Sequence, residues 1–416
     1  MRERVLITGI GCVSCFGLGH SALATDIGSG CSGIVPITAF DTSTCHSHRA
    51  AMIRDFDPGA FIPPMKLRRT DTVSRVALAC ARMLFDDANV APGPGSAESI
   101  GIAIGTFSAG LDSLVEYMSG LTEHGPSGVP AILFSNTVSN APASLCAIEF
   151  GLRGPNVTFN QREASGLAAI VFSVGAIRDG RIAAMVSGGA DCVEETFFKV
   201  HDRFRALSPS RHRRGKIGVP DEAARPFDLR RNGFILGEGG FLLLFESGAA
   251  AERREARVYG EILGVSVTAS KAALNGWPAN SSGLARSMRL ALADAQLEPS
   301  DIAAVFASAN GSPGLDELEA EAINEVFGGR VVAVASVKGA IGESGAAGAG
   351  SLVAGLLSIG EGRIVPTTGF AQADPACEVG VSSRPQPARS DAFIVNSVAS
   401  GGTNCSIVVR ATNGRC

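Results

Sequence analysis

A helix that is apolar on every side most constrains the fold of this 416-residue chain. The stretch 154–167 is predicted to form a strand, then a sharp turn, then the start of a helix over 164–178. Apolar side chains surround that helix: Leu167, Ala168, Ile170, Val171, Phe172, Val174 and Ile177. A helix with no polar face belongs in the protein interior. We therefore expect this helix to lie in the core.

Apolar strands alternate with helical segments along the chain, which is typical of an α/β fold. Strands are expected over 4–8, 100–105, 156–160, 182–187, 240–246, 258–266, 303–308, 331–335, 392–396 and 405–410. Helices are expected over 20–29, 71–88, 109–121, 139–149, 164–178, 280–295, 316–326 and 345–359. The length favours two domains or a duplicated one. We place the halves at 1–250 and 251–416, joined by the polar connection from Gly248 to Arg254.

The composition narrows the class of protein. Hydrophobic residues make up 45% of the chain and charged residues only 18%, which implies a large core or extensive subunit contacts. The net charge of −4 gives no reason to expect nucleic acid binding. No apolar run reaches the roughly 18 residues of a membrane span, and the first residues read as a strand rather than a signal peptide. We expect a cytoplasmic protein.

The cysteines and histidines indicate no metal site and no cofactor. Cys12 and Cys15 form a Cys-x-x-Cys motif without a second pair at ligand spacing, so a structural role is favoured. No histidine follows His212, so the C-terminal half cannot supply a histidine base. The basic stretch from Arg203 to Lys216 is either a solvated connection or a docking surface for an acidic partner.

Glu163 occupies the first turn of the buried helix. This position faces unpaired backbone N–H groups and the positive end of the helix dipole, where enzymes place an activated Cys or Ser. A carboxylate suits the dipole but is a poor group for forming a thioester. The residue leaves two interpretations open: it caps the helix, paired with Arg162, or it has a chemical role.

Several motifs together resemble the β-ketoacyl synthases of fatty acid and polyketide assembly. They run in the family's order across the chain: 5–11, 150–155, 187–191, 225–228, 231–234, 237–240, 336–338, 345–348, 396–397 and 401–404. The block Arg225-Pro226-Phe227-Asp228 with Gly237-Glu238-Gly239-Gly240 is the most specific of them. The resemblance implies a thiolase-like fold, duplicated and layered αβαβα.

Active members of this family use one cysteine and two histidines, and the resemblance places other residues at all three positions. Glu163 stands at the cysteine position, and Asn310 and Glu343 stand at the histidine positions. Lys338 alone remains of the usual polar set. Without histidines it is expected to pair with Glu343 or Glu238, since buried lysines are seldom unpaired. Ser400 stands where active members have a phenylalanine that gates the acyl pocket.

This pattern resembles the chain length factors, or ketosynthase β subunits, of type II polyketide synthases. Such a subunit is catalytically silent and forms a heterodimer with an active ketosynthase α subunit, which receives chains from an acyl carrier protein. Those subunits most often have Gln at the position of Glu163. The glutamate therefore points to a divergent branch, such as systems that make reduced or polyene chains.

A chain length factor shapes a tunnel at the dimer interface. Leu111, Leu114 and Met118 share one face of the helix that matches the tunnel-lining segment, and Phe134 lies in the next such segment. An apolar stripe at this spacing also fits a simple core. Two other functions stay open: a malonyl decarboxylase or diverged acyltransferase acting alone, and an oligomeric binding scaffold.

Overall fold

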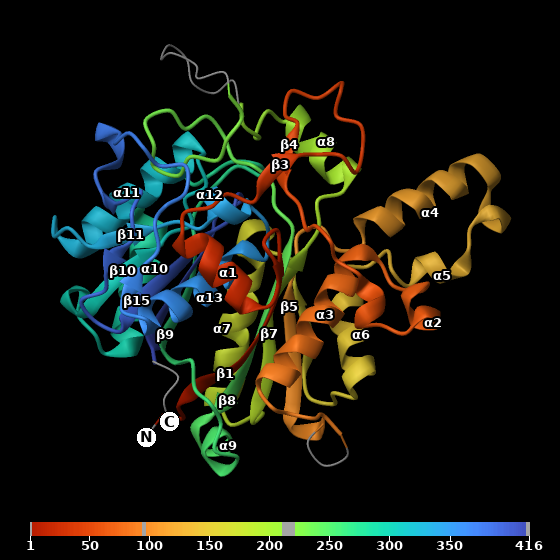
Figure 1. The fold of residues 1–416 in the computed structure, drawn as a ribbon, viewed down its shortest axis with the longest axis horizontal. Coiled ribbons are helices and arrows are strands. Elements are labelled where there is room, and N and C mark those ends of the chain that lie inside the picture. Colours follow the sequence, from red (N-terminus) through yellow and green to blue (C-terminus); the bar gives the residue numbers. More distant parts are fainter. Residues whose placement is uncertain (1, 94–96, 210–220, 413–416) are drawn as a thin grey trace.

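The computed structural model describes residues 2–93, 97–209 and 221–412. Each predicted strand and helix overlaps an observed one. Twelve strands form one large mixed sheet, and helices cover both of its faces (Figure 1). Within the described ranges, none of the helices is long and apolar enough to cross a membrane. Of the basic stretch, residues 210–216 lie outside the described residues, and its docking role stays a prediction.

The N-terminal half contributes five neighbouring strands. They lie in the order β1 (Val5–Ser14), β8 (Gly239–Ser247), β7 (Ala184–Asp191), β5 (Ile100–Gly105) and β6 (Asn156–Phe159). The first two pairings are antiparallel and the last two are parallel. β6 ends this side of the sheet.

The C-terminal half repeats that arrangement. Its strands lie in the order β9 (Gly260–Ala269), β16 (Thr403–Ala411), β15 (Ala392–Val398), β10 (Ile302–Phe306) and β11 (Ala333–Ala335), with β13 (Gly380–Val381) beyond them. Two antiparallel pairings are again followed by two parallel ones. The halves join where β1 pairs with β9. The expected duplicated fold is therefore confirmed.

Two helices fill the middle of the molecule. α7 (Ser165–Arg178) and α13 (Ala347–Gly360) pack against each other between strands of both halves, and each is almost entirely buried (Figure 1). The burial predicted for the all-apolar helix is confirmed. A Cβ on Gly166 would lie 3.0 Å from the carbonyl oxygen of Gly345, so small residues permit this close packing.

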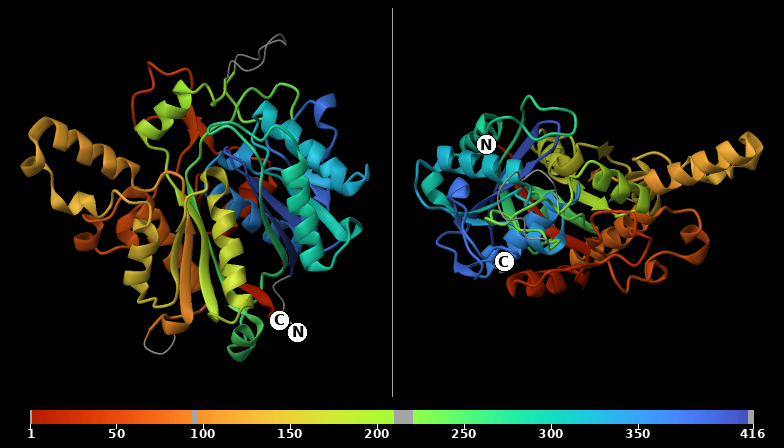
Figure 2. Two further views of the ribbon diagram at one scale, coloured as in Figure 1. Left: turned by 180° about the vertical axis from the view of Figure 1, so that it is seen from behind. Right: turned by 90° about the horizontal axis from the view of Figure 1, so that it is seen from above.

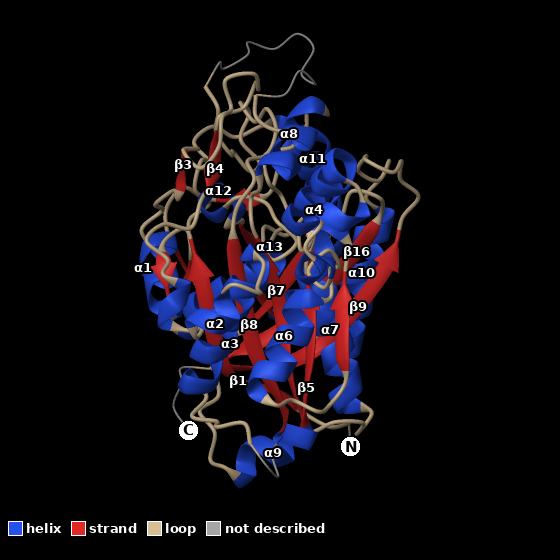
Figure 3. Ribbon diagram, turned by 90° about the vertical axis from the view of Figure 1, so that its right-hand side faces the viewer, coloured by secondary structure: helices blue, strands red, loops and turns tan. Residues whose placement is uncertain are grey.

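The outer layers are formed by four longer helices. α3 (Thr72–Asp87) and α6 (Ala141–Phe150) cover the N-terminal strands, as seen from the side in Figure 3. α10 (Ser282–Ala295) and α11 (Pro313–Phe327) lie on the C-terminal side. α7 contacts β5 and β7 of one half of the sheet and β9 and β16 of the other, so the two halves of the sheet enclose the central pair. Each half of the sheet thus counts as a layer, and with the outer helices they give the five layers expected of the fold.

The first strand is longer than the sequence predicts. A strand over 4–8 was expected, but β1 continues to Ser14 through Gly9 and Gly11. These glycines allow α3 to approach the strand: a Cβ on Gly11 would lie 1.8 Å from the carbonyl oxygen of Cys80. They are there for packing and do not form a turn.

One helical arm extends from the body of the molecule. α4 (Leu111–His124) and the short α5 (Ala131–Phe134) form this arm, which stands out in two views (Figures 1 and 2). Its large apolar side chains are exposed, including Leu114, Met118 and Phe134. The arm therefore presents an exposed apolar surface.

The remaining elements are short. They are α1 (His20–Gly28), α2 (Pro64–Leu67), α8 (Glu195–Arg203), α9 (Gly248–Arg253), α12 (Lys338–Ile341), β2 (Gly17–Leu18), β3 (Ile34–Pro36), β4 (Arg49–Ala51), β12 (Arg363–Ile364) and β14 (Gln386–Pro387). The connection expected between the halves thus contains a helical segment, α9. Ser247 caps it, because its hydroxyl accepts a hydrogen bond from the Ala250 N–H.

Candidate functional site

The elbow between β6 and α7 is a strained turn. Arg162 has a φ of 52°, in the left-handed region that non-glycine residues seldom adopt. A 3₁₀ turn over Arg162–Ala164 follows, and α7 starts at Ser165. The Ser165 hydroxyl accepts a hydrogen bond from the Gln161 N–H (2.9 Å) and donates one to the Arg162 carbonyl (2.6 Å). The turn thus carries Glu163 into the interior, where it is 3% exposed.

The carboxylate of Glu163 binds the closing loop between β15 and β16. The Ser400 N–H donates to Oε2 (2.9 Å), and the Ser400 hydroxyl lies 3.0 Å from both carboxylate oxygens. Ser397 also donates its hydroxyl to the Glu163 carbonyl (2.9 Å). The elbow and the loop at the predicted gate position are therefore tied together.

The predicted pairing of Glu163 with Arg162 is wrong. The Arg162 guanidinium points to neutral acceptors, donating to the Ser400 hydroxyl (3.0 Å) and to Oδ1 of Asn275 (2.8 Å). Among the described residues, Arg162 and Glu163 meet only through Ser400. Its hydroxyl accepts a hydrogen bond from Arg162 and lies 3.0 Å from both Glu163 carboxylate oxygens.

Burial raises the pKa of the Glu163 carboxyl to about 7. The charge of Glu343 raises this pKa too, while hydrogen bonds from the Glu163 N–H and from Ser400 lower it. The group is thus poised to exchange a proton near neutral pH.

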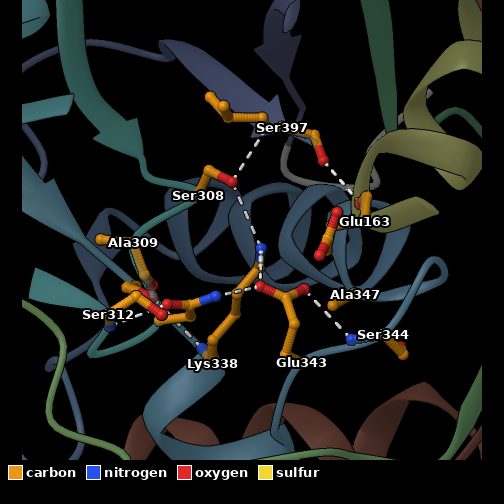
Figure 4. A network of polar contacts seen from close by, with 12 residues as sticks. Glu163, Ser308, Ala309, Ser312, Lys338, Glu343, Ser344, Ala347 and Ser397 are labelled. Atoms are coloured by element: carbon orange, nitrogen blue, oxygen red, sulfur yellow. Dashed lines mark hydrogen bonds and ion pairs between the residues drawn. The ribbon is translucent and has the colours of Figure 1, made fainter. Parts of the chain in front are cut away.

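Lys338 and Glu343 form a closed, buried ion pair behind the elbow (Figure 4). Lys338 Nζ donates to Glu343 Oε2 at 2.8 Å and to the Ser308 hydroxyl at 3.3 Å. Asn310 Nδ2 donates to the same Glu343 oxygen at 2.6 Å, and the Ser344 N–H donates to the other oxygen at 3.1 Å. The prediction that Lys338 pairs with Glu343 is confirmed.

Glu238, the other predicted partner of Lys338, has a different role. Its carboxylate accepts hydrogen bonds from the backbone N–H groups of Ile53 and Val193. It thereby joins an N-terminal loop to the segment after β7.

Two buried carboxylates on α11 hold the loop that carries Asn310. Glu319 accepts from the N–H groups of Ser308 and Ala309, and Asp316 accepts from those of Asn310 and Gly311. Sequence reasoning missed both. Their signal was weak: two acidic residues three positions apart, on the face that α11 buries.

A cavity of about 370 Å³ opens beside Glu163. Aromatic side chains line much of its wall: Phe107, Phe197, Phe204, Phe234 and Trp277. The predicted residues Leu111, Glu163 and Ser400 also line it, together with Arg162 and His201. Asn310, Lys338 and Glu343 are not part of the lining. The site is thus divided into an open cavity and a sealed polar cluster.

His201 was not singled out from the sequence. Its Nδ1 lies 2.8 Å from the carbonyl oxygen of Phe197, one turn earlier in α8, so Nδ1 carries the proton. Burial lowers the pKa of His201, and the charge of Arg162 acts in the same direction. The imidazole is therefore neutral, and Nε2 can only accept a hydrogen bond.

The predicted tunnel residues separate into two groups. Leu111 is half-buried and packs beside Phe107, whereas Leu114, Met118 and Phe134 are 40%, 49% and 63% exposed on the arm. The Phe134 ring contacts Tyr117, with 5.9 Å between ring centroids. The simple-core interpretation is thus wrong for the three arm residues.

The arrangement limits the chemistry available at the elbow. Glu163 can donate or accept a proton near pH 7 but presents no thiol. Lys338 cannot act as a free base, because Glu343 neutralises it inside the protein.

The chain is similar to known proteins over almost its whole length. The sequence model of the Beta-ketoacyl synthase, N-terminal domain, matches residues 2–250, and that of the C-terminal domain matches residues 259–371. The 3-oxoacyl-[acyl-carrier-protein] synthase 2 of Coxiella burnetii is 30% identical, covering 98% of both chains. The tetracenomycin polyketide synthase ketoacyl synthase beta subunit of Streptomyces glaucescens is 31% identical, again covering 98% of both.

Solved structures resemble the chain over almost its full length. The ishigamide ketosynthase/chain length factor superposes with a TM-score of 0.91 at 30% identity, covering 99% of this chain and 100% of that one. A type II polyketide synthase ketosynthase in complex with its acyl carrier protein, AntDE:AntF, gives a TM-score of 0.88 at 25% identity, with the same coverage.

Proposed function

Because the chain belongs to the β-ketoacyl synthase family and has its thiolase-like fold, we propose that it acts as a non-condensing chain length factor, or ketosynthase β subunit. In a type II polyketide synthase of the cytoplasm, it pairs with an active ketosynthase α subunit. It shapes the tunnel that receives the growing polyketide or polyene chain. We divide it into functional halves at 1–250 and 251–416.

The observation that carries this proposal is that Glu163 stands at the elbow, where condensation needs a nucleophile. Condensation by covalent catalysis needs a nucleophile that forms an acyl thioester, and a thiolate beside a base does so. Here Glu163 stands at the elbow with its carboxylate bound to Ser400, and the positions behind it hold the Lys338–Glu343 ion pair. Because these groups satisfy one another, a partner subunit must supply the reactive cysteine.

Two surfaces support a partner subunit. β6 is an edge strand, and a free edge offers backbone groups for pairing with another chain. The arm carries Leu114, Met118 and Phe134 in exposed positions, and exposed apolar patches mark interaction sites. We propose that the partner covers both, and that the arm residues then face the tunnel.

The acyl carrier protein is proposed as a further partner of the complex. The AntDE:AntF structure contains a carrier protein bound to its ketosynthase. We propose that the carrier protein of this complex transfers its acyl chain to the α subunit. In this chain, Ser400 stands at the position of the gating phenylalanine and is bound to Glu163, which supports a closing loop without a gating function.

Co-expression tests the proposal directly. The chain is produced alone and with an active ketosynthase encoded beside it, each with carrier protein and malonyl donor. Condensed product is expected only from the pair, and a partner variant lacking its reactive cysteine is the matched control. Condensation by this chain alone would refute the proposal.

The raised pKa of Glu163 favours a second candidate, decarboxylation of a malonyl thioester. In that step the bond to the terminal carboxylate breaks, CO₂ leaves, and the Glu163 carboxyl donates its proton to the remaining carbanion. Glu163→Gln cannot donate that proton. Measured release of CO₂ by the purified chain that disappears in Glu163→Gln would support this candidate.

A further inference from the structure

Another cavity, of about 340 Å³, lies at the end of the sheet opposite β6. It is bounded by the segment that leads into β11 and by the segment that contains β14, and we call it the edge cavity. In Figure 1, β11 lies on the left of the molecule, whereas the arm that contains α4 is on the right. The edge cavity is therefore separate from the elbow and from the arm, and the proposed chain-length role does not use it.

Two arginines line the edge cavity, and its described lining contains no acidic residue. Arg330 and Arg389 are both exposed. Within the described ranges, neither guanidinium has a hydrogen bond or an ion pair with the rest of the protein. Each guanidinium thus keeps its five N–H donors for another partner. The edge cavity has two positive charges that the protein itself does not neutralise.

The acidic side chains next to this lining in the sequence are already bound elsewhere. Asp301 follows the lining residues of the turn before β10, and its Oδ2 accepts a hydrogen bond from the Glu298 N–H at 2.8 Å. Asp391 follows the lining residues after β14, and its Oδ1 lies 3.6 Å from Nε of Arg410. Neither carboxylate is paired with Arg330 or Arg389, so an anion in the edge cavity has to come from outside the chain.

The buried part of the lining is apolar. It consists of Ile302, Phe327, Val332 and Ile364. Val331 is also part of the lining and is 87% exposed, so it stands at the rim. The volume of about 340 Å³ falls in the range of small-molecule pockets. Two unpaired cations beside an apolar wall fit a ligand that has an anionic head and a compact apolar body.

We propose that the edge cavity binds a phosphomonoester with an aromatic body, with its phosphate on Arg330 and Arg389 and its ring on the apolar wall. A phosphomonoester carries about two negative charges above its second pKa of about 6, and three terminal oxygens. These match two guanidinium groups, each of which can bind phosphate through parallel hydrogen bonds. A carboxylate, with one charge and two oxygens, would leave one arginine unpaired. Exposed ion pairs alone are weak, so contact with the apolar wall has to contribute to the affinity.

Isothermal titration calorimetry of the full chain with 1-naphthyl phosphate tests this proposal, at about pH 8 and constant ionic strength. We expect saturable binding of one molecule per chain. Inorganic phosphate has the head without the body, and 1-naphthol has the body without the head. Each is expected to bind at least about tenfold more weakly than 1-naphthyl phosphate. 1-Naphthyl sulfate, with a single charge, is expected to bind with intermediate affinity.

Variants of the two arginines test where the phosphate binds. Arg330→Gln and Arg389→Gln are each expected to weaken the binding of 1-naphthyl phosphate by about three- to tenfold. Arg384→Gln is the matched control, because Arg384 is an exposed arginine of the same region that does not line the edge cavity. Its loss removes the same charge and should change the affinity by less than about twofold.

A new carboxylate at the rim gives a second, independent test. Val331→Glu places a negative charge beside the phosphate and should weaken binding by at least about tenfold. Leu274→Glu adds the same charge at a residue that is 78% exposed and outside the edge cavity, and it should leave the affinity unchanged. Both residues are exposed, so neither variant disturbs the core.

Three results would overturn the proposal. Equal weakening by Arg384→Gln and by the two cavity variants would show only an effect of overall charge. Inorganic phosphate that binds as tightly as 1-naphthyl phosphate would mean an adventitious ion only. Heat changes that never saturate would exclude a defined site.

Discussion

Glu343 binds Lys338 at 2.8 Å while the two side chains are only 2% and 1% exposed. Two charges removed from water this completely depend on each other, because each would otherwise remain unpaired in the interior. We predict that Lys338→Met alone lowers the free energy of unfolding by about 3–5 kcal/mol. Urea unfolding measures this loss.

The double variant Lys338→Met/Glu343→Gln is the control for that prediction. It removes both charges and keeps an acceptor for Asn310, so it should be more stable than Lys338→Met alone. As a comparison, breaking the exposed ion pair of Arg363 and Glu361 should lower the free energy of unfolding by about 1 kcal/mol or less. If Lys338→Met proved as mild as that, the buried pair would not stabilise the fold.

Glu163 should make stability depend on pH. Its pKa is raised from 4.5 to about 7 in the folded protein, so the folded state keeps the proton that the unfolded state releases. Stability from this group is therefore complete below about pH 4.5 and is lost as pH rises towards 7. The loss amounts to about 3 kcal/mol.

Glu163→Gln isolates that contribution, since glutamine does not titrate. Relative to the unmodified chain, Glu163→Gln should become more stable as the pH rises from 5 to 8. A pH-independent difference at position 163 would contradict the raised pKa.

The exposed arm should tolerate changes in side-chain size. Met118→Ala and Met118→Trp are predicted to change the free energy of unfolding by only about 0.5 kcal/mol, because Met118 is 49% exposed. In the reconstituted pair, the two variants should shift product length in opposite directions. The fully buried Met288→Ala should instead cost about 2–5 kcal/mol. An unchanged product profile would exclude Met118 from the tunnel.

Two glycines near the elbow should respond to alanine in opposite ways. A Cβ on Gly105 would lie 2.1 Å from the backbone carbon of Ser165, so Gly105→Ala pushes α7 away from β5 and costs about 1–3 kcal/mol or more. A Cβ on Gly175, within α7, meets nothing within 4 Å. Gly175→Ala should therefore stabilise the helix by about 0.5–1 kcal/mol. Thermal unfolding of both variants measures the contrast.

The bounds of a helix or strand were predicted most accurately where the local hydrophobic pattern alone determines that element. The helix over 164–178 was predicted almost to the residue, because a fully apolar helix leaves little ambiguity. The strand at the N-terminus was predicted too short, because Gly9 and Gly11 resemble a turn until α3 packs against them.

In the functional site too, contacts between residues close in sequence were predictable, and contacts between distant residues were not. Lys338 and Glu343 are five residues apart, so their pairing was within reach of sequence reasoning. Ser400 is 237 residues from Glu163, and only the folded sheet brings the closing loop to the elbow. The position of His201 in the cavity wall also depends on tertiary packing, as does the contact of both Arg162 and Glu163 with the Ser400 hydroxyl.

The pairing of β1 with β9 has a consequence for how the molecule comes apart. Val5–Ile7 joins Gly260–Ile262 through backbone pairing, and one apolar cluster contains residues of β1, α7, α13 and β16 together. Neither repeat can lose its structure without exposing the core of the other. We therefore expect the two repeats to unfold together, in one transition, although the topology is duplicated.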